Sequence, residues 1–253
     1  MKISLITAVY NRVNTIGHTI ESIQSQTYTN TEHVIQDGGS TDGTLAKIQK
    51  MKTATSHFVS EPDAGIYDAI NRGIVRASGD IIGVLHSDDF FSDNRVLERV
   101  ALAFTDDTVD GVYGDLDYVA VDEPTRIVRR WRSGKYSRSK LQRGWMPPHP
   151  TLFLRREVFE RWGLYDTNLR IAADYDAILR YLLHGRINIV YVPEVLVKMR
   201  VGGESNRSLL QILRKSREDW QVIRRNGAGG VCTLVWKNIS KIEQFLNKKD
   251  RDA

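Results

Sequence analysis

Two hydrophobic periods alternate along the first ninety residues of the chain. Short apolar runs, each followed by turn residues, are typical of strands buried in a sheet. Between these runs, apolar residues recur at helical spacing, as at Ile16, Ile20 and Ile23. The pattern predicts strands over 2–9, 32–39, 56–65 and 79–89, and helices over 14–27, 40–51 and 66–77.

Strands that alternate with helices in this way form a parallel sheet with helices on both faces, so we expect an α/β fold. In such a sheet, a ligand binds at the carboxyl ends of the strands. Polar residues stand at all four of these ends: 7–11, Asp37, 61–63, and the pair Asp88 and Asp89.

The adjacent carboxylates Asp88 and Asp89 directly follow the fourth predicted strand. Neighbouring negative charges repel, and a divalent cation with oxygen ligands would stabilise them together with Asp37 on the same edge. Mg²⁺ or Mn²⁺ with a diphosphate fits, because these ions keep coordination positions for water and phosphate. The alternative is that Asp88 or Asp89 caps the start of the next helix.

The composition excludes several classes of protein. No apolar run approaches the roughly 18 residues of a membrane-spanning helix, and the first residues lack the pattern of a secretory signal peptide. The single cysteine, Cys232, cannot form an internal disulfide, and no Cys/His cluster has zinc spacing. We therefore expect a cytoplasmic protein without structural zinc.

The net charge of +5 is unevenly distributed. Residues 207–253 hold 11 Lys and Arg against 5 Asp and Glu, so the rest of the chain is close to neutral. A second basic run, 126–143, holds eight Lys and Arg and no acid, with aromatic residues between them. Nucleic-acid sites share this composition, but no nucleic-acid motif is present, and a phosphate-bearing lipid acceptor would favour the same residues. We expect no nucleic-acid partner.

Six segments resemble, in order and spacing, the motifs of the family 2 glycosyltransferases: "ISLITAVYN", "VIQDGGSTDGT", "SEPDAGIYDAINRGI", "ASGDIIGVLHSDD", "PHPTLFLRREVFERWGLYD" and "AADYDAILR". The resemblance covers about residues 1–205. It implies a GT-A fold, in which helices flank a mostly parallel Rossmann-like sheet, and an inverting enzyme with a nucleotide-sugar donor. The expected domains are a catalytic domain over 1–206, with a nucleotide-binding half (1–93) and an acceptor half (94–206), and a basic helical extension over 207–253.

The resemblance also implies a nucleotide site at the first two strand ends. Thr7, Ala8 and Tyr10 take the positions that hold the nucleobase. Asp37 matches the carboxylate that hydrogen-bonds a uracil ring, and an ionised carboxylate, which only accepts hydrogen bonds, suits the imide N–H of uracil. Many relatives have a second aspartate where this chain has Gly38, which leaves Asp37 as the single base-reading candidate.

The segment "HSDD" matches the family's metal site. The resemblance implies that Asp88 lies near the ribose or the metal, and that Asp89 is the direct ligand of Mn²⁺ or Mg²⁺. His86 stands where many relatives have aspartate or asparagine. It is either a further metal ligand or a packed side chain held by hydrogen bonds.

Asp174 in "AADYDAILR" matches the family's catalytic base. Inverting transfer needs a base that takes the proton of the acceptor hydroxyl while it attacks the anomeric carbon. Ala173 stands where glutamate is frequent in relatives, so that supporting carboxylate is absent. Asp176 would point elsewhere on a helix, and we expect it to cap the helix or to pair with Arg180.

Two further residues are candidates for contact with the diphosphate or the acceptor. Arg200, ahead of the glycine pair Gly202 and Gly203, could clamp the diphosphate or be a surface charge. His149 follows a pair of prolines, where relatives have residues near the donor sugar or the acceptor. A rigid turn bounded by proline is the alternative for His149.

The segment 227–249 predicts an amphipathic helix. Its apolar face consists of Val231, Leu234, Val235, Ile239, Ile242, Phe245 and Leu246, with Trp236 beside them and Lys237, Lys241 and Lys248 off that face. The helix either lies in a membrane interface or packs against the catalytic domain or a partner subunit.

The sequence as a whole predicts a metal-dependent glycosyltransferase that moves a sugar from a UDP-sugar to a hydroxyl of a growing, lipid-linked surface glycan. The expected location is the cytoplasm, at the inner face of the cytoplasmic membrane. One alternative is a nucleotidyltransferase acting on sugar phosphates, although no glycine-rich phosphate loop follows the first strand. The other is a catalytically inactive glycan-binding or assembly protein of the same fold.

Overall fold

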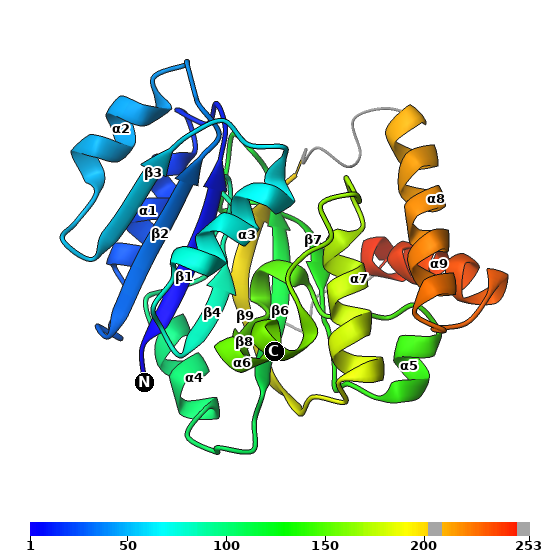
Figure 1. Ribbon diagram of the computed structural model, residues 1–253. Coiled ribbons are helices and arrows are strands. Elements are labelled where there is room, and N and C mark those ends of the chain that lie inside the picture. The colour runs from blue at the N-terminus through cyan, green and yellow to red at the C-terminus, as the bar shows by residue number, and fades with distance from the viewer. Residues whose placement is uncertain (202–208, 247–253) are drawn as a thin grey trace.

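The structure of the chain is a computed structural model that describes residues 1–201 and 209–246, and the side chains of all these except 209–212 and 240–246. In this part of the chain, a nine-stranded sheet has the order β3-β2-β1-β4-β8-β6-β9-β5, with β7 paired to β6. Helices cover both of its faces (Figure 1). The expected α/β fold of helices around a Rossmann-like sheet is confirmed.

The N-terminal half of the sheet is parallel. It contains the strands β1 (Ile3–Val9), β2 (Thr31–Asp37), β3 (Ser56–Ser60) and β4 (Ile81–Val84). The connecting helices are α1 (Ile16–Gln24), α2 (Thr44–Met51) and α3 (Ile66–Arg76). Every residue of β1 is buried, because β1 lies inside the sheet with helices on both faces. The predicted element order is confirmed, although β4 ends five residues before Asp89.

The C-terminal half of the sheet is mixed. Its strands are β5 (Phe90–Phe91), β6 (Gly111–Val119), β7 (Ile127–Trp131), β8 (Phe153–Arg155) and β9 (Ile189–Arg200). The strand β8 joins the two halves, since it pairs antiparallel with both β4 and β6. Gly83 of β4 permits this pairing, because a Cβ atom there would lie 2.5 Å from the ring of Phe153.

The remaining helices surround this half of the sheet. They are α4 (Val96–Ala103), α5 (Arg138–Gln142), α6 (Arg156–Trp162), α7 (Ala173–Leu179), α8 (Leu209–Arg225) and α9 (Val231–Leu246). A 3₁₀ turn, His149–Thr151, precedes β8, and a π-helical turn, Arg180–His184, continues α7. Among the described residues, no helix is long and apolar enough to cross a membrane.

The helices α8 and α9 pack on α7, on the far side of α7 from the parallel strands (Figure 1). Val222 and Ile223 of α8 are 0% exposed and belong to the same hydrophobic cluster as Ile178 of α7 and Ile70 of α3. Leu234 of α9 packs against this cluster. The C-terminal helices therefore share the core of the preceding fold.

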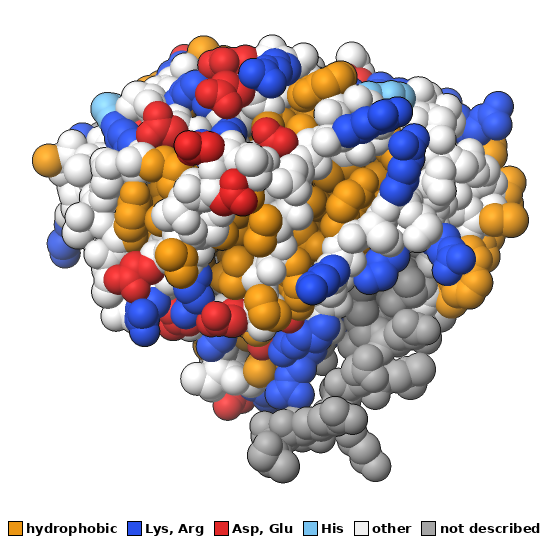
Figure 2. Space-filling model, turned by 90° about the horizontal axis from the view of Figure 1, so that it is seen from below, with side chains coloured by type: hydrophobic (Ala, Val, Ile, Leu, Met, Phe, Trp, Pro, Cys, Tyr) orange, Lys and Arg blue, Asp and Glu red, His pale blue; other side chains and the backbone are white. Residues whose placement is uncertain are grey.

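Acidic side chains are unevenly distributed over the surface of the molecule. Figure 2 shows the underside, where the charged side chains in view toward α5, α8 and α9 are Lys and Arg. Asp and Glu gather on the opposite half of the same face, together with further Lys and Arg. The uneven charge of the sequence thus becomes a basic side of the fold.

Candidate functional site

The carboxyl ends of β1 and β2 lie side by side, with Val9 paired to Asp37. Of the predicted nucleobase residues, Thr7 is 0% exposed, and its Oγ1 donates a hydrogen bond of 2.9 Å to the Leu85 carbonyl. Ala8 is also buried, whereas Tyr10 is 58% exposed. Of the three, Tyr10 alone is exposed, while Thr7 and Ala8 lie inside the sheet.

Asp37 is 0% exposed and organises the turn that follows β2. Its Oδ2 accepts hydrogen bonds from the backbone N–H groups of Gly39 and Ser40, both at 2.9 Å, and from Ser60 Oγ at 2.7 Å. Its Oδ1 accepts a hydrogen bond from Ser40 Oγ. The carboxylate is thus occupied by donors from its own turn and from the end of β3.

Asp89 is 1% exposed, and neither of its carboxylate oxygens has a hydrogen-bond partner. Burial raises the pKa of the Asp89 carboxyl well above its usual range, the charge of Asp88 raises it further, and Arg200 opposes both. A buried carboxylate without a partner is costly unless another group compensates it. Asp89 is therefore a position where a cation would be stabilised.

Arg200 is fixed beside the two aspartates. It is 8% exposed, and its Nη1 donates a hydrogen bond of 2.5 Å to the Asp88 carbonyl. Its Nη2 contacts His18 Nδ1 at 2.6 Å, and its guanidinium lies 4.9 Å from the centre of the Phe90 ring. Arg200 is thus a buried cation next to the acidic pair, and Gly202 and Gly203 lie outside the described residues.

A Mg²⁺ or Mn²⁺ ion fits this site only if oxygens from outside the protein complete its coordination. Among the residues that the structure describes, no three or more His, Cys, Asp or Glu side chains form a group that could hold a metal ion. These ions are usually held by one or two carboxylates together with phosphate oxygens and water. Asp89, with both oxygens free of partners, and the adjacent Asp88 suit that arrangement.

Two histidines link the acidic pair to the predicted base. The rings of His86 and His149 lie 5.7 Å apart, and His149 Nε2 hydrogen-bonds the hydroxyl of Tyr165 at 2.7 Å. Burial lowers the pKa of His149 to about 4 and also lowers that of His86. The charge of Asp174 opposes the shift in both rings, and that of Asp88 opposes it in His86. The neutral rings therefore lie within electrostatic reach of both carboxylates.

Asp174 is the second residue of α7 and is half-buried. Its Oδ1 accepts a hydrogen bond of 2.7 Å from the backbone N–H of Tyr175. The Tyr67 hydroxyl lies 3.4 Å from the same oxygen and donates a hydrogen bond of 2.8 Å to the Ile171 carbonyl. Asp174 is thus held at the start of a helix by a residue of α3.

Glu218 of α8 fixes the loop that leads into α7. Its carboxylate accepts hydrogen bonds from three consecutive backbone N–H groups, those of Arg170 (3.2 Å), Ile171 (2.8 Å) and Ala172 (3.0 Å). The side chain is only 8% exposed. Glu218 lies beyond the segments that resemble the family, and no signal in the sequence indicates its role.

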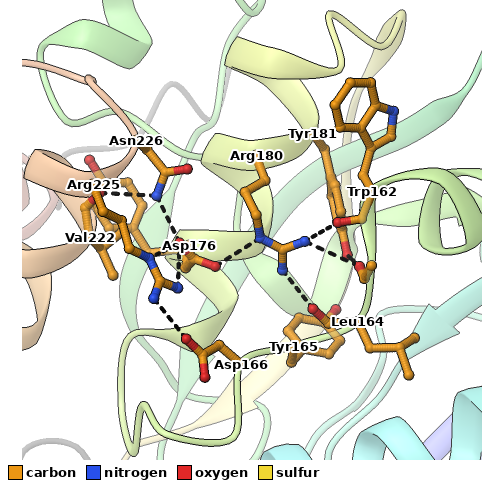
Figure 3. A network of polar contacts seen from close by, with 12 residues as sticks. Trp162, Leu164, Tyr165, Asp166, Asp176, Arg180, Tyr181, Val222, Arg225 and Asn226 are labelled. Atoms are coloured by element: carbon orange, nitrogen blue, oxygen red, sulfur yellow. Dashed lines mark hydrogen bonds and ion pairs between the residues drawn. The ribbon is translucent and has the colours of Figure 1, made fainter.

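Asp176 is 0% exposed and forms a second connection between α7 and α8 (Figure 3). Its Oδ2 accepts a hydrogen bond of 2.9 Å from Arg180 Nε, which confirms the predicted pair. Its Oδ1 accepts hydrogen bonds of 2.7 Å from both Arg225 Nε and Asn226 Nδ2. Asp176 is therefore a structural residue that turns away from Asp174.

Lys237 lies off the exposed apolar stripe of its helix, as predicted, but its side chain is buried rather than solvated. Lys237 is 4% exposed, and its Nζ lies 2.6 Å from Asp219 Oδ1 and 3.2 Å from the centre of the Tyr175 ring. The carboxylate and the ring compensate the buried charge, so α9 packs on the protein through this lysine. The side chains of Lys241, Ile242, Phe245, Leu246 and Lys248 lie outside the described ones.

Four apolar residues of α9 point to solvent, while Leu234 packs on the core. The exposed fraction is 63% for Val231, 47% for Val235, 54% for Trp236 and 44% for Ile239. The neighbouring helix α5 contacts α9 through a hydrogen bond of 2.8 Å from Thr233 Oγ1 to the Gln142 carbonyl. Within the basic run 126–143, Arg138 and Lys140 of α5 and Arg143 directly after it are exposed.

Known proteins resemble the chain in sequence. The family model described as Glycosyl transferase family 2 matches residues 4–163. An uncharacterised glycosyltransferase of Mycobacterium tuberculosis is 33% identical over 183 residues, which cover 72% of this chain and 69% of the relative. A PGL/p-HBAD biosynthesis glycosyltransferase of Mycobacterium bovis is 31% identical over 208 residues, covering 80% and 78% of the two chains.

Solved structures resemble the chain in fold. S. aureus TarS 1–349 in complex with UDP-GlcNAc has a TM-score of 0.68 at 18% identity, covering 89% of this chain and 65% of that chain. The mannosyltransferase PcManGT from Pyrobaculum calidifontis, in complex with GDP-Man and Mn²⁺, has a TM-score of 0.66 at 20% identity, covering 97% and 69%. The matched part spans only 39% of the longer S. aureus TarS chain.

Proposed function

Because the chain belongs to glycosyl transferase family 2, we propose that it transfers a sugar from a UDP-sugar to a hydroxyl group of a growing, lipid-linked glycan, with inversion at the anomeric carbon. The observation that supports this most strongly is Asp89, a buried carboxylate without a partner. It lies next to Asp88, and the ring pair of His86 and His149 connects this acidic pair with Asp174.

Asp174 is the proposed catalytic base. It accepts the proton of the acceptor hydroxyl while the acceptor oxygen forms a bond to the anomeric carbon. On the opposite face of the sugar, the bond from the anomeric carbon to the diphosphate oxygen breaks, and the nucleoside diphosphate leaves with the electron pair. The contacts of Oδ1 with Tyr175 and Tyr67 fix the orientation of the carboxylate, so that Oδ2 can receive the proton.

Asp89 and Asp88 are the proposed ligands of Mn²⁺ or Mg²⁺, together with oxygens of the donor diphosphate. When bound, the ion would neutralise the charge that develops on the leaving diphosphate. The buried guanidinium of Arg200 is within electrostatic reach of both aspartates and adds positive charge at the same point. His149, which is held by Tyr165, is proposed to line the space between the donor and Asp174.

The acceptor side is proposed to contact a membrane through α9. The stripe of Val231, Val235, Trp236 and Ile239 recurs at helical spacing and is exposed. The exposed cations of α5 lie beside it, and a membrane surface with anionic lipid suits an apolar stripe flanked by Lys and Arg. We therefore propose that the protein acts in the cytoplasm as a peripheral protein of the inner membrane face.

A thermal-shift screen with UDP-, GDP- and dTDP-sugars, each with and without Mn²⁺, tests the donor. A ligand that binds only the folded protein raises its unfolding temperature by mass action. We expect the largest shift for a UDP-sugar with Mn²⁺. A larger shift with a GDP-sugar would overturn the choice of nucleotide, and no shift with any nucleotide sugar would overturn the proposed function.

A further inference from the structure

The loop after β3 brings a carboxylate to the place where a side chain at position 38 would lie. A Cβ atom on Gly38 would be only 2.4 Å from Asp63 Oδ2. Gly38 is not among the described glycines with positive φ, so its backbone conformation does not require glycine. A side chain at position 38 would therefore displace the Asp63 carboxylate from its present place.

Position 38 lies next to the backbone at the end of β1, where Tyr10 follows Val9. The Gly38 N–H donates a hydrogen bond of 2.9 Å to the Val9 carbonyl, so the residues that follow β1 and β2 are neighbours. Asp63 Oδ1 accepts a hydrogen bond of 2.8 Å from the Gly65 N–H, which orients the carboxylate. Among the described residues, no donor reaches Oδ2. One oxygen therefore holds the loop, while the other keeps its acceptor capacity.

Asp37, in contrast to Asp63, is fully buried, and its oxygens are already occupied by hydrogen bonds. Its carboxylate is 0% exposed and already accepts hydrogen bonds from Gly39, Ser40 and Ser60. A nucleobase could reach it only if these contacts were broken. Asp63 is half-buried, with one oxygen that lacks a protein donor. Of Asp37 and Asp63, which both lie near position 38, Asp63 is the one that can take an additional hydrogen bond without loss of an existing one.

We infer that Asp63 is the specificity-determining carboxylate of the nucleotide site, and that its Oδ2 accepts the imide N–H of a uracil base next to Tyr10. The inference rests on the proposed function, because it assigns the residue that reads the proposed donor. Many relatives have an aspartate at position 38, where this chain has Gly38. Asp63, from the loop after β3, supplies a carboxylate in its place. Arg170 holds this loop from the other side, through a hydrogen bond of 3.2 Å from Nη1 to the Ala64 carbonyl.

The distinguishing property of such a site is its choice between uracil and cytosine. Uracil presents an N–H at ring position N3, whereas cytosine presents a lone pair there, which a carboxylate repels. The wild-type protein should therefore prefer UDP to CDP. A carboxylate that only stabilised the loop would not favour either base, so the ratio of the two affinities separates the two roles.

Asp63→Asn tests the assignment by calorimetric titration with UDP and CDP. An asparagine keeps the oxygen that accepts from Gly65 but replaces the second acceptor with an NH₂ donor. We expect UDP affinity to fall by about tenfold or more, because a charged acceptor is lost, and the preference for UDP over CDP to disappear. Glu61→Gln is the matched control, because Glu61 pairs with Arg72 and Arg76 and its loss removes one charge from the same loop.

A second variant distinguishes the loss of the carboxylate from a loss of loop structure. Gly38→Asp combined with Asp63→Ala removes the steric conflict and offers the carboxylate from the other loop, so UDP affinity and the UDP preference should return. Wild-type affinities in Asp63→Asn, or an equal loss in Glu61→Gln, would overturn the inference while leaving the proposed function intact. If the wild-type protein binds neither UDP nor CDP, the proposed function fails, and the inference fails with it.

Discussion

At the scale of single residues, Asp174 and Asp176 belong to the same short helix but have different surroundings. Asp174 is half-buried and has Tyr67 and Tyr175 as its neighbours, whereas Asp176 is buried among Arg180, Arg225 and Asn226. A carboxylate with three charge-assisted or amide hydrogen bonds stabilises the fold. The two residues should therefore respond to the same substitution in opposite ways.

We expect Asp174→Asn to lower kcat by about 100-fold or more, because the general base is lost, with little change in donor affinity or unfolding temperature. Asp176→Asn should instead lower the free energy of unfolding by about 1–3 kcal/mol, because Arg180 and Arg225 lose their charged partner. Steady-state kinetics and urea unfolding of both variants check this pair of outcomes. Loss of donor binding in Asp174→Asn would assign that residue to the nucleotide instead.

Single residues also show how far the sequence predicts the site. The pair Asp88 and Asp89 could be predicted, because a carboxylate pair after a buried strand lies at the ligand edge of the sheet. The hydrogen bond from Ser60 to Asp37 could not, because Ser60 reaches Asp37 only through the pairing of β2 with β3. The contact between the rings of His86 and His149 likewise joins positions 63 residues apart.

At the scale of elements, α8 holds the beginning of α7, the helix that carries the proposed base Asp174. Glu218 accepts hydrogen bonds from three backbone N–H groups just before α7. An acidic group at the start of a helix also interacts favourably with the helix dipole. A change in Glu218 should therefore move Asp174 without any change in the nucleotide site. This connection lies beyond the reach of sequence patterns, because Glu218 and Ala172 meet only when α8 folds back on α7.

We expect Glu218→Gln to lower kcat about tenfold while the affinity for the donor stays the same, because a neutral amide holds the backbone N–H groups less tightly. Glu157→Gln, an exposed change at the start of α6, is the control and should leave both quantities unchanged. Kinetics with a saturating acceptor separate the two effects. A change in donor affinity alone would contradict a positioning role for Glu218.

The orientation of α9 illustrates a limit of hydrophobic patterns. Its sequence predicts a helix correctly, but periodicity alone does not tell which face is buried. Asp219 and Tyr175 accommodate Lys237 in the interior, so the apolar stripe of Val231, Val235, Trp236 and Ile239 faces solvent. A truncation that removed α9 would also remove Lys237 from Asp219, and point substitutions are the cleaner test of membrane contact.

Trp236→Glu should abolish co-sedimentation with vesicles that contain anionic phosphatidylserine, because it inserts a charge into the apolar stripe. Gln221→Glu adds the same charge to an exposed position on α8, away from the stripe, and should weaken binding only slightly. Wild-type binding should also weaken as the salt concentration rises. If wild-type protein ignores such vesicles, or if both variants lose binding equally, α9 is not the membrane contact.

At the scale of the whole molecule, buried histidines make the stability of the fold depend on pH. Burial lowers the pKa of His33 to about 3 and that of His149 to about 4, from a usual value of 6.5. Both rings are therefore neutral in the folded chain at pH values where the unfolded chain already binds protons. Their contribution is fully present above pH 6.5 and is lost as the pH falls from 6.5 toward these values.

We expect the free energy of unfolding to decrease as the pH falls from about 7 to 5, because His33, His149 and His86, whose pKa burial also lowers, take up protons on unfolding. Urea unfolding at a series of pH values measures this slope, and His149→Gln should reduce it by removing one of these groups. A free energy of unfolding that is constant over this range would show that these rings are not buried and neutral in solution.

The central claim for the whole molecule is that Asp89 completes a metal site only together with the diphosphate of a donor. Calorimetric titration of UDP into the wild-type protein and Asp89→Asn, each with and without Mn²⁺, tests it without any acceptor. We expect Mn²⁺ to tighten UDP binding in the wild type by about tenfold or more and to have little effect in the variant, because a buried ligand is lost. Equal UDP affinity with and without Mn²⁺ in the wild type, or an unchanged Mn²⁺ effect in Asp89→Asn, would contradict the claim.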